Sequence, residues 1–313
     1  MEEVIIGLDI GGTSIKIGFL QRDGNIIHKW EIPTNKSNNG IYIVDEIWQS
    51  ITEQLASLEM DKKEIVKIGT GAPGFIEKET GMVYETTNMG WKNFELAKRL
   101  KELANVPVYV ENDANMAALG ENWKGSGNQA KDLIFVTLGT GVGSGIIANG
   151  KILNGRNGTA GEIGHLTVEP GGYLCNCGRK GCLETIASAT GVVRQAMDKM
   201  EEHPKSSLAA YYKENGIITS KEIFKFASQG DTICGEIVTR TTDMLGVALA
   251  DVSVIINPSK IIIGGGMSKA GDALLEPVAH AFHKHALGRI SEVCEITIAT
   301  LGNDAGIIGA CTL

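Results

Sequence analysis

The chain opens with three short apolar, β-branched runs at residues 4–10, 15–20 and 26–32. A glycine turn, DIGGTS at 9–14, separates the first two, and Asp23, Gly24 and Asn25 separate the second from the third. Short apolar runs bounded by turn residues are typical of strands. The pattern predicts a meander of three strands at the start of a domain.

The same succession of strand, glycine turn and strand returns near the middle of the chain. Residues 133–138 precede GTGVGSG at 139–145, and 146–152 reads as a second hairpin. Glycine amides can come close to phosphate oxygens because no Cβ intervenes. The repetition predicts an internal duplication in which each half supplies a phosphate clamp, although ordinary hairpin turns would have the same composition. A dinucleotide fingerprint is disfavoured by its glycine spacing, and no Walker-type loop occurs.

Apolar residues recur at helical spacing elsewhere, so strands alternate with helices and an α/β fold is predicted. A third junction of a strand with a glycine run occurs at 261–268. A flat base could lie on the backbone there, and a helix would begin at Ser268. The small-residue segment 301–310 is expected to cross back to the first domain as a hinge. The predicted helices are 41–58, 94–103, a segment after residue 115, 186–200, 220–227, 233–256 and a segment around 280–285.

Length and charge narrow the class of protein. A chain of 313 residues suggests two domains. The net charge is -8 and no basic run occurs, so neither nucleic acid nor an anionic membrane is an expected partner. The acidic N-terminus resembles no signal peptide, so we expect a cytoplasmic protein whose six cysteines are thiols or metal ligands.

One glycine-rich stretch combines a histidine with half of the cysteines. His165, Cys175, Cys177 and Cys182 have the spacing H-x9-C-x-C-x4-C, which suits a closed, structural Zn²⁺ site of the Cys3His type. A disulfide is the alternative, but it would leave the third thiol unpaired. Carboxylates at 162 and 184 frame the stretch, so we expect the metal to order a loop that presents them to a substrate.

Asp113 falls where a β-rich run, 106–110, meets a predicted helix. The helix dipole favours an ionised carboxylate there. An acid in this place can also be a simple N-cap. Asn112 and Asn115 add more polar groups than a cap requires, so the turn is a candidate catalytic site. Asp9, at the end of the first strand, could hold Mg²⁺ through water.

Taken together, the ordered motifs resemble those of the ROK family of sugar kinases, above all its bacterial ATP-dependent glucokinases. The motifs are DIGGT, VENDAN, LGTGVGSG, GEIGH, CNCGRKGCLE, IIIGGG and LGNDAGIIGA. The resemblance implies an actin-like ATPase fold, related to ribonuclease H, with two α/β domains that close on the sugar across an interdomain cleft. It implies a small domain of residues 1–117 plus about 300–313, and a large domain of 118–299 that carries the zinc loop.

The resemblance also implies a role for each site residue. Asp113 would be the general base, and an ordinary aspartate pKa of about 3.9 would keep it ionised at neutral pH. The zinc ligands would be the four residues of the H-x9-C-x-C-x4-C stretch. The implied sugar contacts are Gly74, Asn112, Asp113, Glu162, His165 and Glu184, and the implied ATP contacts are Asp9, Gly11, Gly12, Thr13, Lys16, Gly139, Thr140, Gly141, Gly264, Gly265 and Gly266.

The activity implied is transfer of a phosphoryl group from ATP, with Mg²⁺, to the 6-hydroxyl of glucose in glycolysis. A ROK kinase for another sugar, such as N-acetylmannosamine or fructose, is the alternative. A sugar-responsive transcription regulator is disfavoured, because this chain reaches Asp9 without a preceding helix-turn-helix. The resemblance further implies a homodimer or homotetramer.

Overall fold

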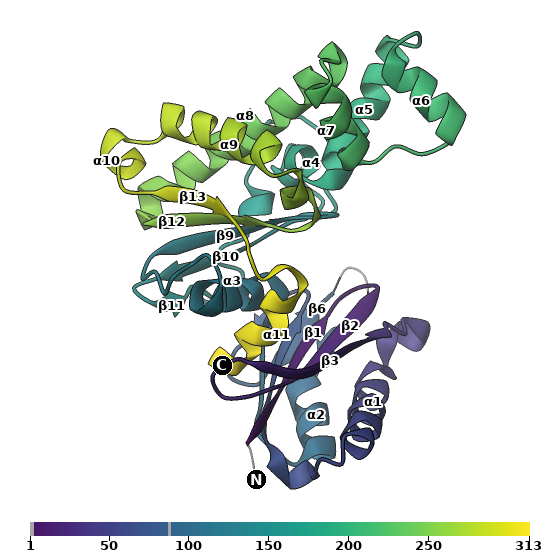
Figure 1. The fold of residues 1–313 in the computed structure, drawn as a ribbon, viewed down its shortest axis with the longest axis vertical. Helices are drawn as coiled ribbons and strands as arrows, with labels where there is room; N and C mark the ends of the chain where they lie inside the picture. Colours follow the sequence, from purple (N-terminus) through teal and green to yellow (C-terminus); the bar gives the residue numbers. More distant parts are fainter. Residues whose placement is uncertain (1–2, 87–88) are drawn as a thin grey trace.

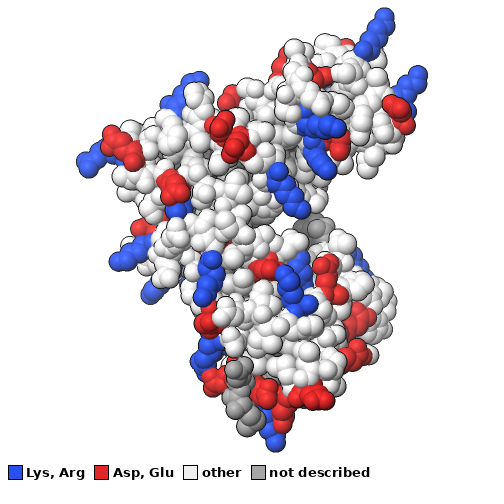
Figure 2. Space-filling view, in the orientation of Figure 1, with Lys and Arg blue, Asp and Glu red and all other residues white. Residues whose placement is uncertain are grey.

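The computed structural model describes residues 3–86 and 89–313. It has two lobes, and each is built on a five-stranded sheet flanked by helices (Figure 1). The space-filling surface narrows between the lobes (Figure 2). The expectation of two α/β units is confirmed.

The first sheet has the strand order β3-β2-β1-β4-β8. β1, β2 and β3 pair antiparallel, whereas β1, β4 and β8 run parallel. The predicted three-strand meander therefore supplies three of the five strands of this sheet. The strands are β1 (Val4–Ile10), β2 (Ser14–Leu20), β3 (Ile26–Pro33), β4 (Ile65–Ala72) and β8 (Val108–Asn112).

The second sheet repeats this topology, with the order β11-β10-β9-β12-β13. Its first three strands are again antiparallel, and β9, β12 and β13 are parallel. The matching order and directions confirm the predicted duplication. The strands are β9 (Leu133–Leu138), β10 (Val142–Ala148), β11 (Lys151–Ile152), β12 (Lys260–Gly264) and β13 (Glu295–Ile298).

The first lobe also contains helices α1 and α2, which the sequence predicted, and a small sheet, which it did not reveal. Helix α1 (Ile43–Ser57) buries its predicted apolar stripe against the first sheet. Helix α2 (Leu96–Ala104) begins later than predicted, because Phe94 is the last residue of a strand and its ring stacks on that of Trp91. The small sheet comprises β5 (Ile76–Glu77), β6 (Met82–Glu85) and β7 (Lys92–Phe94), and the 3₁₀ turns are η1 (Ser37–Gly40) and η2 (Lys62–Glu64).

The second lobe carries most of the helices. The helix predicted over 186–200 is interrupted, because Ser188 has an extended backbone and its side chain caps the next helix at the Gly191 amide. The helix expected from Ser268 begins only at Asp272, after a 3₁₀ turn. The elements are η3 (Ile163–His165), α4 (Glu184–Ala187), α5 (Ala189–Glu202), α6 (Ser207–Asn215), α7 (Ser220–Ser228), α8 (Thr232–Ile256), η4 (Gly266–Ala270), α9 (Asp272–His285) and α10 (Gly288–Ser291).

Two helices cross between the lobes (Figure 1). Helix α3 (Asp113–Lys124) packs on β9 and β10 of the second sheet, and α11 (Ala305–Gly309) packs on β1 and β4 of the first. A Cβ on Gly120 or on Gly309 would overlap a carbonyl oxygen of the other helix, so the two backbones touch directly. The 3₁₀ turns η5 (Gly302–Asp304) and η6 (Ala310–Thr312) flank α11.

Glu121 fixes this crossing from within. Its carboxylate is fully buried and accepts hydrogen bonds from the backbone amides of Thr300, at 3.2 Å, and Leu301, at 2.7 Å. A buried carboxylate requires such donors. The chain that leads from β13 into α11 is thereby tied to the end of α3.

The surface shows no concentration of positive charge on the face seen in Figure 2, where acidic and basic side chains are interspersed. This agrees with the net charge of -8. Within the ranges 3–86 and 89–313, no helix is both long and apolar enough to span a bilayer.

Candidate active site

Strand β8 ends at Asn112 and helix α3 begins at Asp113, so the junction of the two elements presents both side chains between the lobes. The Asn112 side chain caps α3 by accepting hydrogen bonds from the amides of Ala114, at 2.9 Å, and Asn115, at 3.2 Å. Its Nδ2 donates to the carbonyl oxygen of Gly74 at 3.2 Å. The N-cap is therefore Asn112, which leaves Asp113 free of that task.

The buried carboxylate of Glu111 also holds this turn, a role that was not predicted from the sequence. Glu111 is only 5% exposed and accepts hydrogen bonds from the Asn112 amide at 2.8 Å and the Asn115 side chain at 3.0 Å. Its second oxygen accepts from Nδ2 of Asn154 at 2.9 Å. Asn154 belongs to the second lobe, so this bond crosses from one lobe to the other. The residues next to Glu111 and Asn154 in the sequence do not indicate this contact.

The Asp113 carboxyl lies in a poorly hydrated, negatively charged place. Burial, and next the negative charge of Asp9, raise its pKa to about 6; the charge of Glu162 acts in the same direction. The expectation of an ordinary aspartate pKa is therefore wrong, because sequence does not reveal burial. A carboxyl with a pKa near neutrality is a better proton acceptor than an ordinary one and is still ionised at pH 7.

Asp9 reaches the same region from the first sheet. Its carboxylate pairs with Nζ of Lys16 across the β1–β2 hairpin at 3.0 Å. Both side chains remain partly exposed. The turn with Gly11 and Gly12 closes through the Gly11 amide, which donates to the Ser14 carbonyl at 2.9 Å. Asp9, Lys16 and the first glycine turn are thus on one hairpin beside Asp113.

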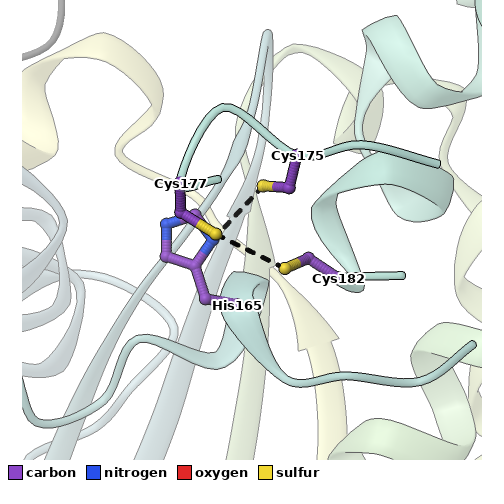
Figure 3. Close-up of side chains that lie close together, drawn as sticks. All are labelled: His165, Cys175, Cys177 and Cys182. Carbon is purple, nitrogen blue, oxygen red and sulfur yellow. Dashed lines mark hydrogen bonds between the residues drawn. The ribbon is translucent and has the colours of Figure 1, made fainter. Parts of the chain in front are cut away.

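The predicted zinc ligands lie together (Figure 3). Their four ligand atoms are all within 4.8 Å of one another. Cys177 Sγ lies 3.6 Å from Cys182 Sγ, and Cys175 Sγ lies 3.7 Å from Nδ1 of His165. Ligands at about 2.0–2.3 Å from a tetrahedral Zn²⁺ stand roughly 3.5–3.8 Å apart. The donor set and its spacing fit that ion.

Backbone hydrogen bonds within the loop that carries these ligands add to the packing of its two ends, Ile163 and Leu183, in the core. The Cys175 amide donates to the Arg179 carbonyl at 2.8 Å, and the Gly178 amide donates to the Cys175 carbonyl at 2.9 Å. Burial raises the pKa of the Cys175 thiol to about 12, whereas at Cys177 hydrogen bonds from Arg179 and the neighbouring thiols outweigh burial and bring the pKa down to about 6. A thiol that ionises readily is suited to binding a metal.

Glu162 and Glu184 face the same space from either side of the metal cluster. Burial raises the pKa of Glu162, the proximity of His165 opposes this, and the charge of Glu184 adds to it. Glu162 precedes η3, and Glu184 begins α4. Because Glu162 also acts on Asp113, the predicted acids and His165 form one continuous site between the lobes.

The two glycine turns of the second lobe lie next to one another. Gly265 has a φ of +83°, and a Cβ there would overlap the backbone of Leu138, directly before Gly139. The glycine run at 264–266 therefore flanks the turn at 139–141. Two surface hollows of about 410 and 440 Å³, around His203 and Arg240, contain none of the predicted site residues.

The fold and this site define a class of protein. Duplicated sheets of the same strand order, joined by two crossing helices and carrying glycine turns at the interface, are the architecture of an actin-like ATPase. The chain belongs to the ROK family, whose family model matches residues 5–313.

Individual relatives are similar over nearly the whole chain. A glucokinase of Halalkalibacterium halodurans is 50% identical over 305 residues, which cover 97% of this chain and 92% of the relative. A glucokinase of Thermotoga maritima is 35% identical, with 99% and 96% covered. The crystal structure of a ROK-family glucokinase from Streptomyces griseus, in complex with glucose and AMPPNP, is 34% identical with a TM-score of 0.81, covering 99% of this chain and 98% of that one.

Proposed function

We propose that this protein is a glucokinase, which transfers the γ-phosphoryl group of ATP to the 6-hydroxyl of glucose. The observation that carries the proposal is the Asp113 carboxyl, set at the start of α3 with a pKa raised to about 6 in a chain that is 50% identical to a glucokinase. Glucose and AMPPNP bound to the Streptomyces griseus relative support both substrates.

In this proposal Asp113 accepts the proton of the sugar hydroxyl as its oxygen bonds to the γ-phosphorus and the bond to ADP breaks. Gly74, Asn112, Glu162, His165 and Glu184 orient the sugar. The glycine turns and Lys16 hold the nucleotide. Asp9 would hold Mg²⁺ through water, and the bound ion would neutralise phosphate charge. The ATP contacts proposed are Asp9, Gly11, Gly12, Thr13, Lys16, Gly139, Thr140, Gly141, Gly264, Gly265 and Gly266.

We also propose that the His165, Cys175, Cys177 and Cys182 cluster holds a structural Zn²⁺. His165 presents Nδ1 to the thiols, which leaves Nε2 available to a sugar oxygen. The division into a small domain of 1–117 plus about 300–313 and a large domain of 118–299 is supported by the two sheets, with α3 at the boundary. A cytoplasmic location and a homodimer or homotetramer stay predictions.

A sugar panel tests the proposed function directly. We expect ADP release with ATP and Mg²⁺ to be fast on glucose and at least about tenfold slower, as kcat/KM, on N-acetylmannosamine, fructose and mannose. Preference for another sugar would keep the mechanism and change the substrate. Absence of turnover on every sugar would contradict a kinase and favour a sugar-binding regulator.

The pH dependence of turnover tests the environment of Asp113. Because the base must be ionised and its pKa is about 6, we expect kcat/KM to fall by half near that pH and then by about tenfold per pH unit below it. An aspartate with an ordinary pKa of about 3.9 would place this fall two units lower. A profile measured in wild type between about pH 4.5 and pH 8 separates the two.

A further inference from the structure

We propose that Glu184 is a positioning residue that couples the sugar pocket to the donor loop, by which we mean residues 139–142. This inference rests on the proposed function, in which Glu184 contacts the sugar and the donor loop contacts the phosphates of ATP. It adds a direct mechanical link between two ligand sites that are otherwise assigned to separate motifs.

The donor loop rests on the segment that starts at Glu184. The Val142 amide donates a hydrogen bond to Oε2 of Glu184 at 3.0 Å. The Ala189 amide donates to the Gly139 carbonyl at 2.8 Å, and Oγ1 of Thr190 donates to the Thr140 carbonyl at 2.6 Å. Three residues of the donor loop are thus held by one stretch of seven residues, 184–190, which follows the metal ligand Cys182.

Gly141 shows how closely the carboxylate fits under the loop. A Cβ at position 141 would overlap Oε2 of Glu184, whereas a Cβ at Gly139 would meet nothing within 4 Å. Neither glycine has a positive φ. A methyl group at position 141 would therefore have to displace the Glu184 carboxylate, whereas the conformation of the turn does not itself call for glycine there.

The second oxygen of Glu184 faces the other way. Its Oε1 accepts from the Cys175 thiol at 3.5 Å. Oε1 thus lies beside the cluster of His165 and Cys175, and the proposed function places a sugar hydroxyl at this oxygen. The negative charge of Glu184 contributes to the raised pKa of Glu162, the other acid of the pocket, so the two carboxylates lie near one another.

One carboxylate therefore has one oxygen on the donor loop and one beside Cys175, where the proposed function places the sugar. Because the group is rigid and planar, moving one oxygen moves the other. Thermodynamic linkage requires the coupling to be reciprocal: if nucleotide bound at the donor loop changes the affinity for the sugar by some factor, bound sugar changes the affinity for nucleotide by the same factor. Both directions can be measured by binding, without turnover.

The first arm of the test changes the donor loop and measures the sugar. We expect Gly141→Ala to raise the Kd for glucose, determined by calorimetry without nucleotide, by about tenfold, because the added methyl group displaces Glu184. Gly139→Ala is the matched control in the same loop. It should raise the KM for ATP and leave the glucose Kd within about twofold of wild type.

The second arm changes the pocket and measures the nucleotide. Glu184→Asp withdraws the carboxylate from the Val142 amide, so we expect the Kd for ADP, measured without sugar, to rise by about fivefold or more. Glu162→Asp is the control acid, which should weaken glucose binding and leave the ADP Kd unchanged. If Gly141→Ala does not fold, this arm decides alone.

Independent behaviour would overturn the inference: a Gly141→Ala protein that binds glucose as wild type does, or a Glu184→Asp protein with the wild-type ADP Kd. Failure of the proposed function is visible separately, since wild type would then turn over no sugar. If the panel reveals another sugar as substrate, that sugar replaces glucose in the first arm.

Discussion

Asp113→Asn will lower kcat for glucose phosphorylation by about 10²- to 10⁴-fold, the range that a general base contributes. The amide keeps the shape of the side chain and can still accept the hydrogen bond that the Ala114 amide donates to Oδ1 at 2.9 Å. It cannot accept the sugar proton. Steady-state kinetics with saturating ATP and glucose measure the loss.

Binding and stability should survive the same change. Burial beside Asp9 and Glu162 disfavours a charge at 113, so the neutral amide should unfold at a temperature no lower than that of wild type. Glucose affinity should remain measurable by calorimetry. The control is Asp251→Asn on the exposed surface of α8, which should keep wild-type kcat. An Asp113→Asn enzyme with normal kcat would exclude Asp113 as the base.

Cys177→Ser will abolish binding of the proposed Zn²⁺ and raise the KM for glucose by about tenfold or more, or unfold the second lobe. Cys177 is exposed, so its replacement costs little packing. Backbone hydrogen bonds hold the rest of the loop, and we expect the positions of His165 and Glu184 to shift when the metal is lost. Elemental analysis should find about one zinc per chain in wild type and far less in the variant.

The matched control is Cys311→Ser, at a half-buried thiol far from the loop in sequence and packed near the carbonyl of Gln21. It should keep zinc, thermal midpoint and glucose KM. A Cys177→Ser protein that lacks zinc yet retains the wild-type midpoint and KM would show that the metal is not needed to order the pocket.

The strands and the metal cluster could be predicted from sequence because their signals are local. Val4–Ile10 and Leu133–Leu138 are apolar runs that end at a glycine turn, and the four predicted ligands occur within eighteen residues, 165–182. The repeated hairpins were enough to predict the duplication that the strand orders confirm.

Contacts between distant segments had no such signal. The bond from Asn154 to Glu111 joins residues 43 apart, and the one from the Val142 amide to Glu184 joins residues 42 apart. The break at Ser188 was hidden because a single serine in an apolar, helical sequence does not disclose that it is a cap. The raised pKa of Asp113 depends on burial and on the charges of Asp9 and Glu162, which are distant from it in the sequence.

The exchange of helices between the lobes has a consequence for synthesis on the ribosome. The face of the first sheet at Gly7 and Gly69 has no room for side chains, because the carbonyls of Ile307 and Ala310 lie against it. That face cannot be covered until α11 has emerged, nearly three hundred residues after β1. The nascent N-terminal sheet therefore keeps this face uncovered until nearly the whole chain has been made, and incompletely covered sheets of this kind are prone to aggregate.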